Sequence, residues 1–159
     1  MHMDEQKPIF VVDCMLGRLA KWLRIFGFDV VYFRSIQDEK LMGISKAPGH
    51  ILLTRDTGVI KRSDIGPYLL ITSDFLREQL SQVFESLDLC VHSDTFLTRC
   101  LSCNQPLEPV GCEHAQGRVP DFVFLSYRRF SRCTGCGKFF WAGTHQREMQ
   151  KMMQRLFVR

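Results

Sequence analysis

Four cysteines form two close pairs, in the segments "CLSC" and "CTGC". Two thiolates separated by two residues can bind one ion from a single tight turn. Two such turns complete a tetrahedral zinc site with Zn–S distances of ~2.3 Å. The stretch "CGKFFWAG" agrees with this interpretation because a glycine and an aromatic segment follow the second pair. The spacing therefore predicts a closed, structural zinc site with the ligands Cys100, Cys103, Cys133 and Cys136.

Two other chemistries use such pairs, and both fit less well. A thioredoxin-type redox motif begins a helix behind a strand, and neither pair has that context. A zinc deaminase has a proline directly before its Cys-x-x-Cys, where this chain has Arg99 and Arg132. The total of seven cysteines is odd, which argues against a closed disulfide framework. We interpret Cys14, Cys90 and Cys112 as buried apolar residues or free thiols.

A second group of candidate residues is acidic and follows apolar runs. Asp13 ends "IFVVD" and Asp56 ends "ILLTRD". Residues beyond the carboxyl ends of neighbouring parallel strands share one crevice. Carboxylates gathered there repel one another unless a cation neutralises them, and oxygen ligands suit Mg²⁺ or Mn²⁺. Asp38 and Glu39, near the start of a predicted helix, are expected at the same edge of the sheet.

Such a metal site can activate water and stabilise charge on a phosphodiester. Arg18, Lys21 and Arg24 follow Asp13 closely and could hold a phosphate backbone. A simpler alternative stays open, because strand-end Asp residues commonly serve as loop or cap residues. The three basic residues could equally form a solvated helix face.

Alternating strands and helices would position these acids. Apolar runs predict four buried strands, and helical spacing or turn signals separate them. This alternation predicts an α/β fold with a parallel sheet flanked by helices. No Gly-x-Gly-x-x-Gly follows the first strand, so a dinucleotide-binding fold is disfavoured; a receiver domain would need an acid pair at the first strand end. The strands are expected at 9–13, 28–33, 51–54 and 68–72, and the main helices at 16–26, 35–47 and 73–84.

The pattern changes near Leu87, where helical periodicity disappears and Cys, Gly, Pro and Asn become frequent. We expect a first domain at 8–90, a four-cysteine zinc ribbon at 97–143 and an amphipathic basic helix at 144–159. The segment between the cysteine pairs exceeds the ~15 to 20 residues of common ribbons. We expect it to contain a small β excursion at "PDFVFLSY".

Composition and charge narrow the class of protein. The chain has 159 residues, 45% hydrophobic and 24% charged, as in soluble globular proteins. It has no run of the ~20 apolar residues that span a bilayer and no signal peptide, so we expect a cytoplasmic protein. The net charge of +4 is modest, but basic residues are concentrated in 118–159. That asymmetry favours a polyanionic partner.

Four blocks of the chain, in this order, resemble the Mut-seven C-terminal ribonuclease domain family, a PIN-like nuclease domain followed by a zinc ribbon. The blocks are "DCMLGRLAKWLRIFGFDV", "ILLTRD", "RCLSCNQPL" and "FSRCTGCGKFFWAGTH". The resemblance implies a PIN-like fold and metal-dependent cleavage of RNA. By position it makes Asp13 and Asp56 acidic ligands, with Asp38 as the acid that opens the second helix. Glu39 is its neighbour, and Asp74 follows the fourth strand, where PIN-type nucleases often have another acid.

These expectations combine into a metal-dependent ribonuclease that acts on single-stranded RNA. Mg²⁺ or Mn²⁺ would be held by Asp13, Asp38 and Asp56, and a structural Zn²⁺ by the ribbon. The alternative is a non-catalytic RNA-binding or adaptor protein with a vestigial acid cluster, possibly attached through its C-terminal helix to a protein or an RNA-rich particle. The residues expected to contact RNA are Arg18, Lys21, Arg55, Arg128, Arg129, Lys138 and Trp141, with Phe139 and Phe140 as further stacking surfaces.

Overall fold

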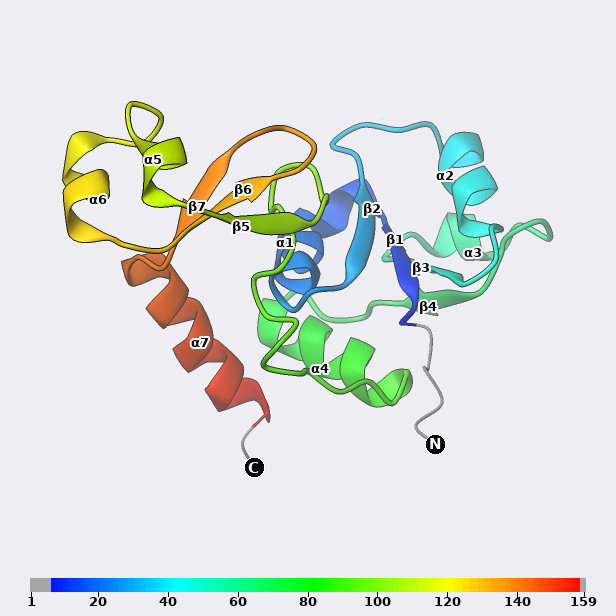
Figure 1. The fold of residues 1–159 in the computed structure, drawn as a ribbon. Coiled ribbons are helices and arrows are strands. Elements are labelled where there is room, and N and C mark those ends of the chain that lie inside the picture. The colour runs from blue at the N-terminus through cyan, green and yellow to red at the C-terminus, as the bar shows by residue number, and fades with distance from the viewer. Residues whose placement is uncertain (1–6, 158–159) are drawn as a thin grey trace, which may run out of the picture. The chain divides into compact units, whose positions relative to one another are not determined.

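The computed structural model describes residues 7–157 (Figure 1). The chain divides into two compact units, one ending at Leu97 and the other beginning at Thr98. Within residues 7–157, no helix combines the length and the apolar character needed to cross a bilayer.

The first unit contains a sheet of four parallel strands in the order β2-β1-β3-β4. Strand β1 pairs with both β2 and β3, so Val12 lies opposite Tyr32 on one side and Leu53 on the other. This confirms the predicted α/β class. The strands are β1 (Ile9–Val12), β2 (Asp29–Tyr32), β3 (His50–Thr54) and β4 (Tyr68–Leu70).

The strands carry apolar side chains on both faces of the sheet, and helices cover these faces. Val11 and Leu52 are buried against Leu41 and Met42 of α2, and Val59 of α3 joins that cluster. The helical elements of this unit are η1 (Cys14–Leu16), α1 (Gly17–Ile25), α2 (Asp38–Ser45), α3 (Thr57–Ile60) and α4 (Leu76–Ser86).

A cluster of aromatic rings forms a second part of the core. Phe28 contacts both Phe10 of β1 and Phe84 of α4, with ring centroids 5.4 Å and 5.8 Å apart. Phe26 packs edge-on against Phe84 at 5.5 Å. These rings tie α1 and α4 to the sheet.

The carboxyl end of α1 is closed by a later segment of the same unit. Gly27 adopts φ = +88°, and a Cβ at this position would lie 2.2 Å from the carbonyl oxygen of Thr95. The Leu97 N–H donates to the Ile25 carbonyl at 2.7 Å, and the Thr95 hydroxyl donates to the Phe26 carbonyl at 3.2 Å. Gly27 therefore ends the helix, as its type predicts, and also allows this close approach.

The second unit contains an antiparallel sheet in the order β5-β6-β7. Its core is formed by Ala115, Val119, Val123 and Phe130. The elements are β5 (Leu107–Val110), α5 (Cys112–Ala115), α6 (Asp121–Ser126), β6 (Phe130–Cys133), β7 (Phe139–Trp141) and α7 (Thr144–Phe157).

The predicted β excursion at "PDFVFLSY" is wrong, because this segment forms α6. Pro120 precedes the helix and Asp121 lies in its first turn, where a negative charge suits the helix dipole. Val119 and Val123 are buried, while Phe122 is 70% exposed. Strand alternation would bury Leu125 together with Val123, but Leu125 is 74% exposed, so the pattern of burial does not match a strand.

Candidate functional site

The two cysteine pairs occupy turns with the same backbone pattern. In the first turn, the Asn104 N–H donates to the Cys100 carbonyl, and the Cys100 N–H donates to the Gln105 carbonyl. In the second turn, the Gly137 N–H donates to the Cys133 carbonyl, and the Cys133 N–H to that of Lys138. The fourth residue after each leading cysteine has a positive φ, +71° at Asn104 and +74° at Gly137.

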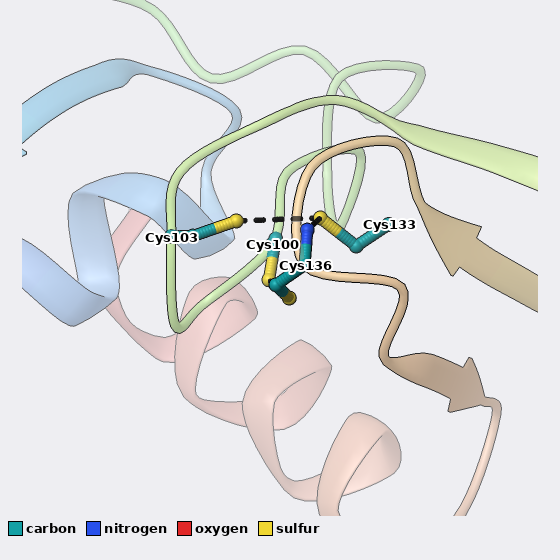
Figure 2. Close-up of side chains that lie close together, drawn as sticks. All are labelled: Cys100, Cys103, Cys133 and Cys136. Atoms are coloured by element: carbon teal, nitrogen blue, oxygen red, sulfur yellow. Dashed lines mark hydrogen bonds between the residues drawn. The ribbon is translucent and has the colours of Figure 1, made fainter.

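These turns bring the four sulfurs together from loops that are distant in sequence (Figure 2). The Sγ atoms of Cys100 and Cys136 lie 3.7 Å apart, and those of Cys103 and Cys133 lie 3.3 Å apart. All four sulfurs lie within 4.8 Å of one another. A tetrahedron of sulfurs around an ion at ~2.3 Å has edges of about 3.8 Å, so the cluster can hold a metal ion such as zinc.

Hydrogen bonds to one sulfur favour its anionic form. The N–H groups of Gly135 and Cys136 both point to the Cys133 sulfur at 3.3 Å. Burial raises the pKa of the Cys133 thiol, but these N–H groups and the Cys103 thiol outweigh burial and lower the pKa to about 6. Burial raises the pKa of Cys100 to about 12. A cation in the centre would favour the thiolate at every position, as a metal site requires.

The acidic residues of the first unit centre on the ends of β1 and β3. Asp13 follows β1 and is only 7% exposed. Its Oδ2 accepts a hydrogen bond of 2.8 Å from the hydroxyl of Thr54, the last residue of β3. The same hydroxyl oxygen accepts the Asp56 N–H at 3.0 Å. Thr54 therefore links the Asp13 carboxylate directly to the backbone of Asp56.

This pair lies where the order of the sheet reverses. The chain goes from β1 to β2 on one side and then to β3 on the other side of β1. In open parallel sheets, ligands bind beyond the carboxyl ends of strands at such a switch point. Asp56 is exposed there, and its Oδ1 accepts the Gly58 N–H at 2.7 Å as the cap of α3. Asp13 also caps η1 by accepting the Met15 N–H at 3.3 Å.

The other candidate acids are exposed and differently engaged. Asp38 and Glu39 lie in the first turn of α2. Glu39 pairs with Arg62 at 3.3 Å, and its backbone N–H, followed by Arg62, lowers the pKa of its carboxyl. Asp74 pairs with Arg55. Within residues 7–157, the cysteine cluster is the one set of three or more His, Cys, Asp or Glu close enough to share an ion, so Asp38 does not join Asp13 and Asp56.

The basic residues after Asp13 differ in position. Arg18 and Lys21 are exposed on α1. Arg24, in contrast, is 7% exposed and donates to the Val30 carbonyl from Nη2 at 2.9 Å. Arg24 therefore ties α1 to β2, and the expectation that it could hold a phosphate backbone is wrong.

The residues of the predicted zinc ribbon that are expected to contact RNA are all in the second unit. Arg128, Arg129 and Lys138 are exposed, and Trp141 is half-buried. Lys138 Nζ donates to the Ser102 hydroxyl at 2.8 Å, which connects the two cysteine turns.

Thr54 is the residue that sequence reasoning missed. A threonine at the end of an apolar strand signals β propensity first and a hydrogen-bonding role only second. Its position two residues before Asp56 was the available signal, because Ser and Thr hydroxyls commonly accept the N–H two residues later.

One comparison with known proteins found a family for this chain. The model of the family described as "Mut7-C RNAse domain" matches residues 8–153. Searches of curated proteins and of solved structures gave no match.

Proposed function

Because the chain belongs to the Mut7-C RNAse domain family, we propose that it is a ribonuclease that hydrolyses phosphodiester bonds with a bound Mg²⁺ or Mn²⁺. The observation that carries the proposal is the link Asp13–Thr54–Asp56 at the switch point of the sheet. It places two carboxylate residues at the edge where parallel sheets bind ligands.

The proposed roles divide among three kinds of residue. Asp13 and Asp56 would hold the cation, and Asp38, Glu39 and Asp74 are further acids expected near the same edge. A bound cation supplies an activated water and stabilises charge on the phosphodiester. Oxygen donors from carboxylates suit Mg²⁺ and Mn²⁺, which fits the chemistry of this donor set. The residues proposed to hold phosphates here are Arg18, Lys21 and Arg55.

The second unit would contribute binding rather than chemistry. Four thiolates leave a zinc ion no open position, so the ion would stabilise the unit. Its exposed cations and aromatic rings would bind RNA in the manner of other single-strand binders. The residues are Arg128, Arg129, Lys138 and Trp141.

The test is cleavage of mixed RNAs with added Mn²⁺ by Asp56→Asn and by a matched control. Asp56→Asn removes a charge from an exposed side chain whose amide oxygen can still cap α3. Asp64→Asn removes a charge from another exposed acid, which pairs with Lys46 at 3.2 Å. We expect Asp56→Asn to lose cleavage and to keep RNA binding, while Asp64→Asn keeps both. Full cleavage by Asp56→Asn would refute the proposal.

A non-catalytic RNA-binding or adaptor protein is the second candidate. The observation that favours it is that Glu39 and Asp74 are engaged in ion pairs, and that three carboxylates do not gather within residues 7–157. In this case α7, with Met149, Met152 and Met153 half-buried, would attach the chain to a protein or ribonucleoprotein partner. RNA binding by the wild type without cleavage under any divalent cation would select this candidate.

A further inference from the structure

A groove of about 470 Å³ lies in the second unit, beside the second cysteine turn. Its size is in the range of small-molecule sites, ~300–1,000 Å³. One of its lining residues, Cys136, belongs to the cysteine cluster, and none belongs to the acidic edge. The lining residues that matter for binding are Ser102, Arg118, Lys138, Phe139, Phe140 and Trp141.

The charge of the groove is positive. Arg118 and Lys138 are both exposed, and no Asp or Glu is among its described lining residues. Lys138 Nζ donates to the Ser102 hydroxyl, so one wall of the groove has an ammonium held at a known position. Arg118 forms no ion pair with an acid of residues 7–157, and its guanidinium is available to an anion. Two cations without a carboxylate suit a phosphate group.

The other wall is aromatic. Phe139, Phe140 and Trp141 are consecutive on β7 and are all half-exposed. Phe139 and Trp141 also pack against the core of the unit, which fixes their rings. Phe140, which lies between them in the sequence, also lines the groove. Fixed, half-exposed rings next to cations are the combination that binds bases by stacking.

We propose that this groove binds a nucleotide unit of single-stranded RNA. The phosphate lies at Arg118 and Lys138, and the base stacks on the exposed aromatic wall. Duplex RNA does not fit, because its bases are stacked on one another and their faces are hidden. The proposal deepens the function proposed above, but it needs RNA binding alone and no cleavage.

A competing explanation for the cations is that they neutralise the metal centre. Four thiolates and one Zn²⁺ carry a net charge of −2, and Cys136 lies on the groove wall. Under that explanation, removing Arg118 and Lys138 releases zinc and leaves Phe140 without a role in RNA binding. The zinc content of the variant without these cations and the RNA affinity of Phe140→Ala therefore distinguish the two explanations.

The first experiment uses Trp141 as a reporter. The chain has two tryptophans, so Trp22→Phe leaves Trp141 alone. In a Trp22→Phe, Asp56→Asn chain, which cannot cleave under the proposed function, we expect a single-stranded oligoribonucleotide to change the Trp141 emission. A duplex of the same sequence should leave it unchanged. Saturating binding of the single strand, measured by anisotropy of a labelled strand, without any change in Trp141 emission would overturn the proposal.

The second experiment compares charge removal at two places. Arg118→Ala with Lys138→Ala removes the groove cations, and Lys7→Ala with Lys46→Ala removes two exposed cations that precede β1 and β3. The salt dependence of single-strand binding has a slope of about −0.7 per phosphate contact, so loss of the one phosphate contact at Arg118 and Lys138 should reduce the slope of the groove variant by about 0.7. The control variant should keep it.

Phe140→Ala should weaken single-strand binding about tenfold, with zinc retained. Equal salt slopes for the two charge variants, or zinc loss in the groove variant together with normal binding by Phe140→Ala, would overturn the proposal. If the wild type binds single-stranded RNA in the groove but does not cleave it, the proposed ribonuclease activity is refuted and the proposed binding site stands.

Discussion

The cysteine centre and the acidic edge bring their polar side chains together in opposite ways. Each cysteine pair is held by hydrogen bonds within its own short turn, so the geometry of each pair is determined by residues close in sequence. At the acidic edge, the hydrogen bond between Thr54 and Asp13 joins residues that are 41 positions apart. That contact exists only where β1 pairs with β3.

This difference gives the two sites different requirements. The cysteine centre stands in a small unit with a short sheet, and small units of this kind commonly need a metal for stability. The acidic edge is supported by a buried parallel sheet and needs no ion to hold Asp13 in place. We therefore expect metal loss to unfold the second unit and to spare the first.

Among the variants considered, Cys133→Ser is expected to have the largest effect on stability. The buried Cys133 sulfur accepts two N–H groups and faces three other sulfurs, and serine is a poor zinc ligand. Structural zinc contributes about 10–16 kcal/mol of apparent binding free energy at pH 7, much of which is folding free energy. We expect loss of zinc and rapid proteolysis of the second unit, with the first unit intact.

Cys112→Ser is the matched control, because Cys112 lies in the same unit outside the cluster. It should keep the zinc content of the wild type. Protease resistance of the second unit in Cys133→Ser would contradict the proposed role of the metal.

The next effect tests Thr54. Thr54→Val leaves the buried Asp13 carboxylate without its hydroxyl donor, and unsatisfied buried groups cost about 1–3 kcal/mol. Urea unfolding of the first unit should show this loss, and RNA cleavage should fall. Thr54→Ser keeps the hydroxyl and should restore both. Equal behaviour of the valine and serine variants would show that the link between the two acids has no role.

Two variants of Asp56 can separate its role as the cap of α3 from its proposed role in catalysis. Asp56→Ala removes the acceptor for Gly58 and should cost about 1 kcal/mol, the usual value for a lost cap. Asp56→Ser can still accept this bond and should keep most of the stability, but it removes the carboxylate. Both variants should lose cleavage. A serine variant that cleaves RNA normally would assign Asp56 to structure alone.

The smallest expected effect on stability is that of removing Arg62, the partner of Glu39. Its backbone N–H and then Arg62 lower the pKa of its carboxyl, so Arg62→Ala should raise this pKa towards the ordinary value, as an NMR titration can follow. A carboxyl with a lowered folded pKa adds stability above its unfolded pKa of ~4.3 and loses it as the pH falls through the folded value. The effect on stability is small because both groups are exposed. Lys61→Ala should leave the pKa unchanged.

The cysteine centre could be predicted from the sequence because its determinants are short-range. Two residues between cysteines, and a residue able to adopt positive φ after each pair, are visible in the letters alone. The parallel direction of the four strands also follows from the alternation of strands and helices together with the rules for parallel connections. Their order, β2-β1-β3-β4, does not follow from these rules.

The rest depends on contacts that a linear pattern does not contain. Arg24 looks like its neighbours Arg18 and Lys21, yet it is buried because its helix position faces β2. The segment of α6 resembles a strand because Phe and Val favour strands locally, but Val123 is buried while Leu125, two residues later, is exposed. Asp38 stands at the start of α2 as expected, but the relation of a helix start to the strand ends depends on the loop before it.

The contact between residues 95–97 and the carboxyl end of α1 determines how short an independent first unit can be. A truncated chain that stops at residue 90 would lack the Leu97 and Thr95 donors and would leave the Ile25 and Phe26 carbonyls to solvent. It would also remove the segment that covers Gly27. A shortened version for isotope labelling or crystallisation should therefore extend through Leu97, because the last residues of this unit close its first helix.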